Sequence, residues 1–272
     1  MIRIILILLF SFPVALCAQT YQQLSEKAIE YIEMDSLSKA EELLLQALKL
    51  EPKNAKNAML FSNLGLVQRR LGEYDKALES YSFALNFAPL AVPILLDRAA
   101  INLEMGNTDR AYTDYCQVLD EDKQNKEALL MRAYIYVLRR DYPAARIDYN
   151  RLLELDPQNY SGRLGLATLE QKEGKFKEAL EILNKMIAAT PEDATLYIAR
   201  ADVEREMKHE DLALVDLEEA IRLKPSSADA YLLRGNIYLT QKKKALAKTD
   251  FEKAISLGIP PADLHEQLKQ CK

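Results

Sequence analysis

The fold follows from residues 126–159, which read KEALLMRAYIYVLRRDYPAARIDYNRLLELDPQN. The alanine near the middle of this stretch, Ala145, has counterparts at intervals of 34 residues in both directions. This column of alanines consists of Ala77, Ala111, Ala145, Ala179, Ala213 and Ala247. Ala40 precedes them and is three residues out of register. A constant spacing of this size means that one supersecondary unit is copied along the chain.

Three further columns accompany the alanines and describe a pair of packed helices. Twelve residues before each alanine is a small residue, which allows two helices to approach closely. This column consists of Ala28, Gly65, Ala99, Ala133, Ala167, Ala201 and Gly235. Four residues after the alanines are the bulky residues Leu44, Tyr81, Tyr115, Tyr149, Leu183, Leu217 and Phe251. Three residues further on are Ala47, Ala84, Val118, Leu152, Met186, Ala220 and Ala254. The spacing i, i+4, i+7 is typical of the buried stripe of an amphipathic helix.

Punctuation residues mark where these helices begin and end. Proline, which ends a helix, follows the alanine by twelve residues in five units. These prolines are Pro52, Pro89, Pro157, Pro191 and Pro225. The next helix is predicted to open on a good N-cap residue, namely Asn57, Asn125, Asn159, Asp193 or Ser227. Between the two helices, Gly72, Gly106 and Gly174 permit the left-handed conformation of a helix end. Each unit is therefore predicted to be a helix, a tight turn and a second helix.

The combined pattern resembles the tetratricopeptide repeat (TPR). A small residue stands at position 8 of each unit, alanine at 20, an aromatic residue or leucine at 24, and proline at 32. The resemblance implies an all-α fold, a right-handed superhelical solenoid of seven helix-turn-helix units followed by a capping helix at 262–272. The units are predicted at 21–54, 58–91, 92–125, 126–159, 160–193, 194–227 and 228–261. Because no Gly/Ser-rich linker separates them, we expect one solenoid and no second domain.

Three irregularities interrupt the array. Residues 55–57 are an insertion between the first two units, which should alter their stacking locally. Lys123 stands where the third unit should have proline. Arg163 replaces the bulky residue expected at position 4 of the fifth unit, so this unit is predicted to pack more loosely.

The N-terminus predicts export from the cytoplasm. One arginine precedes an apolar run from Ile4 to Phe12, and small residues follow it. This arrangement is typical of a secretory signal peptide, which we place at residues 1–18, with Gln19 as the first residue of the mature chain. The alternative is lipid anchoring through Cys17, which Leu16 disfavours because such sites prefer a small residue before the cysteine. The mature chain is expected to be periplasmic or secreted, without insertion into the membrane.

Composition and polar residues argue against several classes of function. The chain has 41 acidic and 36 basic residues and a net charge of −5, whereas nucleic-acid binding favours a basic face. His209 and His265 have no second histidine or cysteine at ligand spacing, so no metal site is expected. No phosphate-binding glycine loop or nucleophile elbow is present in the sequence. We therefore expect a non-enzymatic protein that needs no cofactor.

One polar constellation recurs with the repeat. Arginine occupies position 7 and aspartate position 23 of the same four units. The pairs are Arg98 and Asp114, Arg132 and Asp148, Arg200 and Asp216, and Arg234 and Asp250. In a helical hairpin these columns would face each other and form one ion pair per unit. An anion-binding site is the alternative interpretation.

The resemblance also implies where a partner would bind. In this family the first helices line the concave face of the superhelix, with positions 2, 5, 9, 12 and 13 pointing into it. The residues predicted to line the groove are Arg69, Arg70, Leu96, Leu103, Leu130, Tyr134, Val137 and Thr168. Our hypothesis is an extended or helical peptide along units two to five, with an acidic group near Arg69 and Arg70. The alternative is that packing between repeats uses some of these side chains.

The leading functional prediction is an exported adaptor or scaffold that binds a protein or peptide in its concave groove. A second possibility is a structural or assembly component of a cell-envelope complex, engaged through its convex face or its ends. A third is an enzyme accessory or carbohydrate-binding module, which would favour exposed aromatic residues in the groove. The lysine, asparagine and arginine clamp of one subfamily, which holds a C-terminal carboxylate, is effectively missing because only Asn63 matches it.

Overall fold

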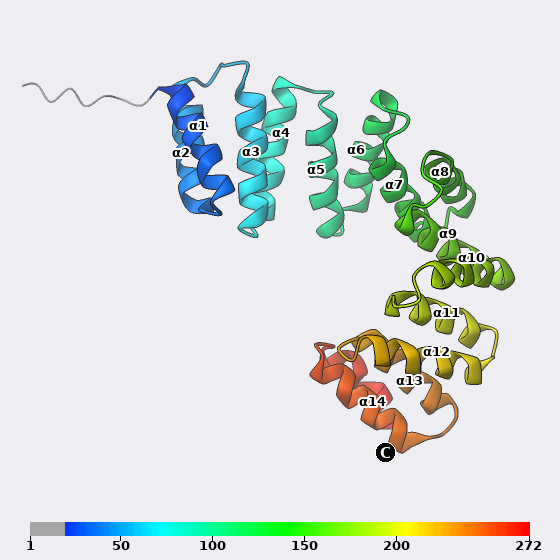
Figure 1. The fold of residues 1–272 in the computed structure, drawn as a ribbon. Helices are drawn as coiled ribbons and strands as arrows, with labels where there is room; N and C mark the ends of the chain where they lie inside the picture. The colour runs from blue at the N-terminus through cyan, green and yellow to red at the C-terminus, as the bar shows by residue number, and fades with distance from the viewer. Residues whose placement is uncertain (1–19) are drawn as a thin grey trace, which may run out of the picture. The chain divides into compact units, whose positions relative to one another are not determined.

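Seven helical hairpins account for almost all of the described chain. The computed structural model describes residues 20–272, and within them it contains α-helices, one short 3-10 turn and no strand (Figure 1). The hairpins are α1 (Tyr21–Glu33) with α2 (Leu37–Leu50), α3 (Asn57–Arg70) with α4 (Tyr74–Phe87), α5 (Val92–Glu104) with α6 (Thr108–Glu121), α7 (Lys126–Leu138) with α8 (Tyr142–Leu155), α9 (Tyr160–Lys172) with α10 (Phe176–Ala189), α11 (Ala194–Glu206) with α12 (Glu210–Leu223), and α13 (Ala228–Thr240) with α14 (Lys244–Ser256). The predicted all-α solenoid fold of helix pairs is confirmed. The signal peptide and Cys17 lie outside the described residues.

The chain divides into two compact units, one ending at Lys123 and the other beginning at Gln124. The first holds α1 to α6, and the second holds α7 to α14 and the C-terminal segment. Within each unit, the second helix of one hairpin packs against the first helix of the next, as α2 does on α3 and α8 on α9. A continuous apolar core therefore runs through each unit from one hairpin to the next.

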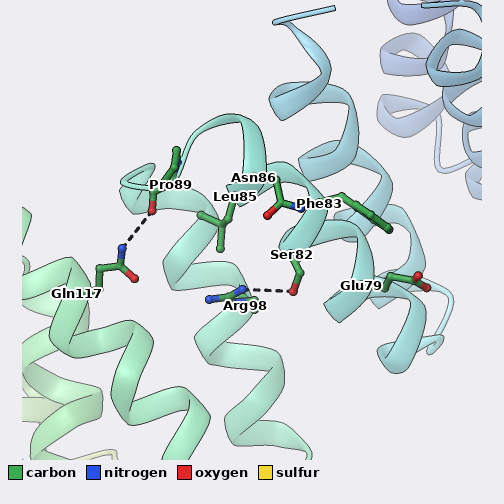
Figure 2. A pocket seen from close by; sticks show the side chains of 8 residues that line it. All are labelled: Glu79, Ser82, Phe83, Leu85, Asn86, Pro89, Arg98 and Gln117. Atoms are coloured by element: carbon green, nitrogen blue, oxygen red, sulfur yellow. Dashed lines mark hydrogen bonds between the residues drawn. The ribbon is translucent and has the colours of Figure 1, made fainter. Parts of the chain in front are cut away.

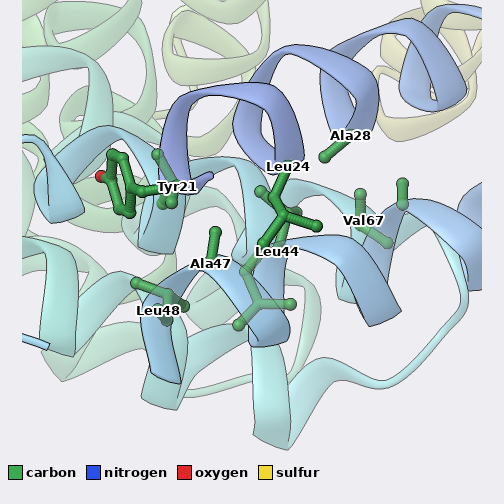
Figure 3. Packing of buried hydrophobic residues seen from close by; sticks show 10 residues of the cluster. Tyr21, Leu24, Ala28, Leu44, Ala47, Leu48 and Val67 are labelled. Carbon is green, nitrogen blue, oxygen red and sulfur yellow. The ribbon is translucent and has the colours of Figure 1, made fainter. Parts of the chain in front are cut away.

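The alanine column forms the centre of this core. All seven alanines, Ala40 included, are completely buried, and so are the bulky residues one turn later. The small residues opposite them are needed because the helices touch there. A Cβ atom on Gly65 would lie 2.8 Å from the ring of Tyr81, and one on Gly235 would lie 2.8 Å from the ring of Phe251. Figure 3 shows the same packing in the first hairpin, where Ala28, Leu44 and Ala47 lie together.

The same turn closes every hairpin, with or without glycine. The predicted glycines Gly72, Gly106 and Gly174 have φ between 74° and 78°. The other four hairpins place Asp35, Arg140, Lys208 and Lys242 at this point, with φ between 57° and 67°. In each turn the following N–H bonds back to a carbonyl five residues earlier, as Glu73 does to Gln68. This Schellman-type bond satisfies a carbonyl at the end of the helix and requires the left-handed residue.

Three of the five predicted N-caps are confirmed by their hydrogen bonds. Asn125, Asn159 and Asp193 accept hydrogen bonds from backbone N–H groups of the first turn. Ser227 stands at the N-cap of α13, but its side chain makes no capping bond. The prediction for Asn57 was wrong. Lys56 is the N-cap of α3, and Asn57 lies inside the helix with its side chain fully buried.

The fifth hairpin, α9 with α10, has the least extensive contact of the seven, in line with the expectation from Arg163. Arg163 is only partly buried, and its guanidinium donates to the side chain of Gln158 outside the helix. The glycines beside it, Gly162 and Gly165, lie against α8 of the preceding hairpin, close to Leu152 and Tyr149. Because Arg163 turns to Gln158, position 4 of this unit lacks the bulky apolar side chain that the other units place there.

The C-terminal segment covers the last hairpin. It forms a 3-10 turn, η1 (Pro261–Leu264), followed by the short helix α15 (His265–Gln270). Leu264 is buried against the core of α13 and α14, and Leu268 packs partly on it, so the segment covers the end of this core. The segment begins as a 3-10 turn and not as an α-helix, because Pro260 and Pro261 stand at its start. None of the helices within residues 20–272 has the length and apolar character needed to cross a bilayer.

Candidate protein-binding surfaces

The four predicted arginine–aspartate pairs form, and each is bidentate. In every pair the arginine Nε and Nη2 donate to the two carboxylate oxygens at 2.6–2.9 Å. The aspartates are buried, with Asp114 and Asp250 each only 3% exposed. The hydrogen bonds that Arg200 donates to Asp216 raise the pKa of Arg200, and those that Arg234 donates to Asp250 raise the pKa of Arg234. The pairing within each hairpin is therefore confirmed, and the donors facing each carboxylate are already used.

The remaining nitrogen of two of these arginines reaches the preceding hairpin. Arg98 Nη1 donates to the hydroxyl of Ser82 on α4 at 3.2 Å. Arg200 Nη1 donates to the side-chain carbonyl of Asn184 on α10 at 2.7 Å. These bonds connect one repeat to the next, which is a structural role. They leave little of either guanidinium for the alternative of an anion site.

A second, partly buried network was not predicted from the sequence. Arg146 on α8 donates to the two carboxylate oxygens of Glu170 on α9 at 2.5 and 2.9 Å, and also pairs with Glu173. Lys175 donates to Glu173 at 2.8 Å, and this bond, with a further one from Arg146, lowers the pKa of Glu173. Arg146 and Glu170 lie 24 positions apart, and neither belongs to a column that defines the repeat.

The predicted groove residues of the first compact unit are largely occupied by neighbours. Arg69 pairs with Glu104, which belongs to the next first helix, α5. Arg70 donates to Asp35 at 2.6 Å and to the carbonyl of Ile32. Leu96 and Leu103 are half-buried. An acidic ligand at Arg69 and Arg70 would have to displace carboxylates that the chain itself supplies.

Other apolar side chains of these first helices are more exposed. Met59 on α3 is 52% exposed, and Ile29 on α1 and Leu66 on α3 are also exposed. They stand at positions 2 and 9 of their units, which the family resemblance assigns to the concave face. We call Ile29, Met59 and Leu66, with the predicted residues of α3 and α5, the N-terminal first-helix face.

The second compact unit has its own first-helix face, formed by α7 and α9. Leu130 and Val137 are half-buried, because they pack on the core of α7, α8 and α9. Tyr134 and Leu138 are 45% and 51% exposed. Thr168 is exposed, and its hydroxyl donates to the carbonyl of Leu164 in its own helix. Tyr134 and Leu138 are therefore the apolar side chains of this face that are most available to a partner.

A hollow of about 530 Å³ lies between α1 and α3, within the N-terminal first-helix face. Its apolar lining includes Ile29, Met59 and Leu60, and its charged lining consists of Glu26, Glu51 and Lys56. We call it the α1–α3 hollow. The repeat columns do not predict this hollow, and the insertion at 55–57 beside it is the one signal in the sequence.

The second helices of the first compact unit present a different surface. A hollow of about 300 Å³ lies beside α4. Figure 2 shows the residues that line it, among which Arg98 donates to Ser82 and the amide of Gln117 donates to the carbonyl of Pro89. Phe83 at its edge is exposed. Its ring lies 5.3 Å from that of Phe61, which also stacks on Phe87 at 6.0 Å. We call Phe61, Phe83 and Phe87 the phenylalanine cluster.

No group of three or more histidine, cysteine, aspartate or glutamate side chains suited to a metal ion occurs within residues 20–272. His209 is hydrogen-bonded through Nδ1 to Glu204 at 2.7 Å. His265 lies in the C-terminal cap. The surfaces described above carry exposed apolar side chains beside charged ones.

Family comparison identifies the class of protein. Models of the tetratricopeptide repeat match residues 26–91, 96–160, 138–203 and 228–257. A crystal structure of a tetratricopeptide repeat protein from Parabacteroides merdae is similar to the chain at 36% sequence identity and a TM-score of 0.84, covering 92% of this chain and 98% of that one. The chain belongs to the tetratricopeptide repeat family, whose repeats are scaffolds that generally mediate protein–protein interaction.

More distant structures share the fold. The C-terminal part of a repeat protein from Cytophaga hutchinsonii is 15% identical, with a TM-score of 0.61 and coverage of 89% of this chain and 98% of that one. The pilF protein of Pseudomonas aeruginosa is 17% identical, with a TM-score of 0.60 and coverage of 77% and 94%. No curated protein matches the sequence.

Proposed function

We propose that the protein is an exported, non-enzymatic adaptor that binds a protein or peptide partner on its first-helix faces. The observation that carries this proposal is the exposure of large apolar side chains on these helices, with Met59, Tyr134 and Leu138 about half exposed. Exposed apolar groups bordered by polar ones mark interaction sites in soluble proteins. The residues proposed to contact the partner are those predicted from the sequence, extended by Ile29, Met59, Leu66 and Leu138.

Capture from a native extract tests which face binds. Tyr134→Ala combined with Leu138→Ala should abolish capture of the partner by the full chain, as read by crosslinking mass spectrometry. Ile147→Ala combined with Leu212→Ala is a matched control, because these apolar residues are as exposed but lie on second helices. Loss of capture in the control pair alone would overturn binding through the first helices.

The phenylalanine cluster favours a second candidate function, assembly into a larger complex through the second helices. Phe83 and Phe87 are exposed although their rings are large and apolar, and their stacking on Phe61 holds them in place. In this case Phe83→Ala combined with Phe87→Ala would abolish capture, and the Tyr134 and Leu138 pair would not.

Export is a separate part of the proposal, supported by the apolar run from Ile4 to Phe12 in the sequence. N-terminal sequencing of the native protein should begin at Gln19. An intact Met1 would overturn export, and a blocked, lipid-modified Cys17 would establish the anchored alternative.

A further inference from the structure

We infer that the α1–α3 hollow receives a basic side chain, lysine or arginine, of the bound partner. The inference rests on the proposed function and adds the chemistry that the partner must carry. A basic residue has a long aliphatic stem and a charged end, so its receptor needs an apolar wall and a carboxylate within reach of that end. The α1–α3 hollow offers both.

The apolar wall comes from two successive first helices. Ile29 of α1 and Met59 of α3 line the hollow and remain exposed to solvent, whereas Leu60 beneath them is buried. Because an unbranched thioether adapts to irregular shapes, Met59 suits contact with a flexible stem. The volume of about 530 Å³ admits one long side chain and part of the peptide that carries it.

Carboxylates from two directions supply the charge. Glu26 on α1 accepts a bond from the amide of Gln22 at 2.8 Å through Oε1. Glu51, after α2, accepts one from the amide of Asn54 at 2.7 Å through Oε2. Within the described chain, the second oxygen of each carboxylate has no hydrogen-bonding partner. Burial, and to a smaller extent the negative charge of Glu51, raises the pKa of the adjacent Tyr21.

The insertion at 55–57 forms part of the rim of this site. It carries Asn57 into the interior, where the side chain accepts a bond from the hydroxyl of Tyr21 at 3.0 Å and donates to the carbonyl of Glu51 at 2.8 Å. Asn54 accepts a bond from the N–H of Lys56 at 2.9 Å while it donates to Glu51. Glu51 is therefore part of a preorganised rim, and Glu26 is held on α1 by its bond from Gln22, which lowers the entropy lost on binding.

Lys56 is the one cation among the lining residues, and it is exposed. Two carboxylates against one ammonium group leave the hollow negative, so a basic side chain is favoured over an acidic one. Lys56 would compete with a basic ligand for Glu51. Its removal is therefore expected to strengthen binding, in the opposite direction from removal of the carboxylates.

The test selects binders of the full chain from a phage-displayed library of random heptapeptides. Lysine or arginine should be enriched at one position, and its replacement by norleucine should weaken binding about tenfold, the loss of one charge-assisted hydrogen bond. Glu26→Gln combined with Glu51→Gln should remove the difference between lysine and norleucine. Lys56→Ala should raise the affinity for the lysine peptide.

The matched control is Glu30→Gln combined with Glu33→Gln, which removes the same charge from α1 outside the lining of the hollow and should preserve the preference. Thermal unfolding of each variant verifies that it is folded. Selection of acidic or purely apolar residues, or an equal effect of the control, would overturn the basic-side-chain receptor while leaving peptide binding intact. Failure to select any peptide would count against the proposed function and the inference built on it.

Discussion

Arg98 and Asp114 form a bidentate ion pair across the third hairpin, with Nε to Oδ2 at 2.9 Å and Nη2 to Oδ1 at 2.7 Å. Asp114 is buried, while Arg98 is partly exposed and also bonds to Ser82. Removing Arg98 leaves a buried carboxylate without its partner. The loss of stability is therefore expected to be larger than for an ion pair on the surface.

Replacing Arg98 with leucine is expected to lower the free energy of unfolding by about 3 kcal/mol, because Asp114 then stays buried without a counter-charge. Urea denaturation followed by circular dichroism measures this loss. A change below about 0.5 kcal/mol would mean that solvent screens the pair as it does on an open surface.

The fifth hairpin provides the control for this substitution. It has Leu166 and Ile182 at the positions of Arg98 and Asp114, so the same fold tolerates an apolar pair there. The double variant Arg98→Leu with Asp114→Ile should recover most of the lost stability. A double variant as unstable as the single one would show that the arginine acts through its bond to Ser82 instead.

Gly65→Ala should destabilise the protein by about 1–3 kcal/mol, because the added methyl group overlaps the buried ring of Tyr81. Combining it with Tyr81→Leu should restore stability, since the first hairpin already pairs Ala28 with Leu44. Thermal unfolding of the single and double variants measures both effects. Equal loss in the two variants would contradict steric overlap as the cause.

Lys242→Gly in the last turn should stabilise the protein slightly, by at most about 0.5 kcal/mol. Lys242 has a φ of 61°, a conformation that costs an L-residue about 1 kcal/mol. Glycine avoids this cost, but its greater freedom in the unfolded chain offsets part of the gain. Gly174→Lys, at the equivalent turn of the fifth hairpin, is the reverse control and should destabilise. The shift in melting temperature reports both, and a fall for Lys242→Gly would contradict the assigned turn strain.

Stability is expected to fall at alkaline pH. Burial, together with the neighbouring Tyr134, raises the pKa of Tyr149 from 10.0 to about 12 in the folded state. A raised pKa means that the folded state holds the proton more tightly, so the stabilisation is complete below pH 10 and is lost between pH 10 and 12. The rise of two pKa units corresponds to a stabilisation of the folded state by about 2.7 kcal/mol at most.

Tyr149→Phe should therefore reduce the fall in melting temperature between pH 9 and 12. Tyr74→Phe serves as the control, because Tyr74 is exposed at the start of α4. If both variants follow the wild-type pH dependence, another group controls the alkaline transition.

The repeat could be predicted because its contacts are local and copied. Ala145 meets its partners within one hairpin, so every unit shows the same residue types at the same spacing, and the Arg98–Asp114 pair follows the same logic. The turns were also predictable at Gly72, but the turn at Lys242 carries no sequence signal. There the backbone bonds of the helix end impose the left-handed conformation on a residue that disfavours it.

The candidate surfaces were less predictable from the sequence. Arg69 and Leu130 stand at the predicted positions, yet Arg69 pairs with Glu104, and Leu130 packs partly into the core. Position within a repeat indicates the side of the helix on which a residue lies. It does not indicate how much of the side chain the next repeat covers, because that depends on rotamers and on the rotation between hairpins.

The sequence by itself determined that this protein is a series of helical hairpins, because small residues, alanines and bulky residues at a 34-residue period have only one way to be buried together. The tertiary structure alone decided the fate of the insertion. It turned Asn57 from an apparent helix cap into a buried link between Tyr21 and Glu51, beside the α1–α3 hollow. The physical reason is that a buried amide must satisfy its hydrogen bonds, and its partners come from another helix and loop.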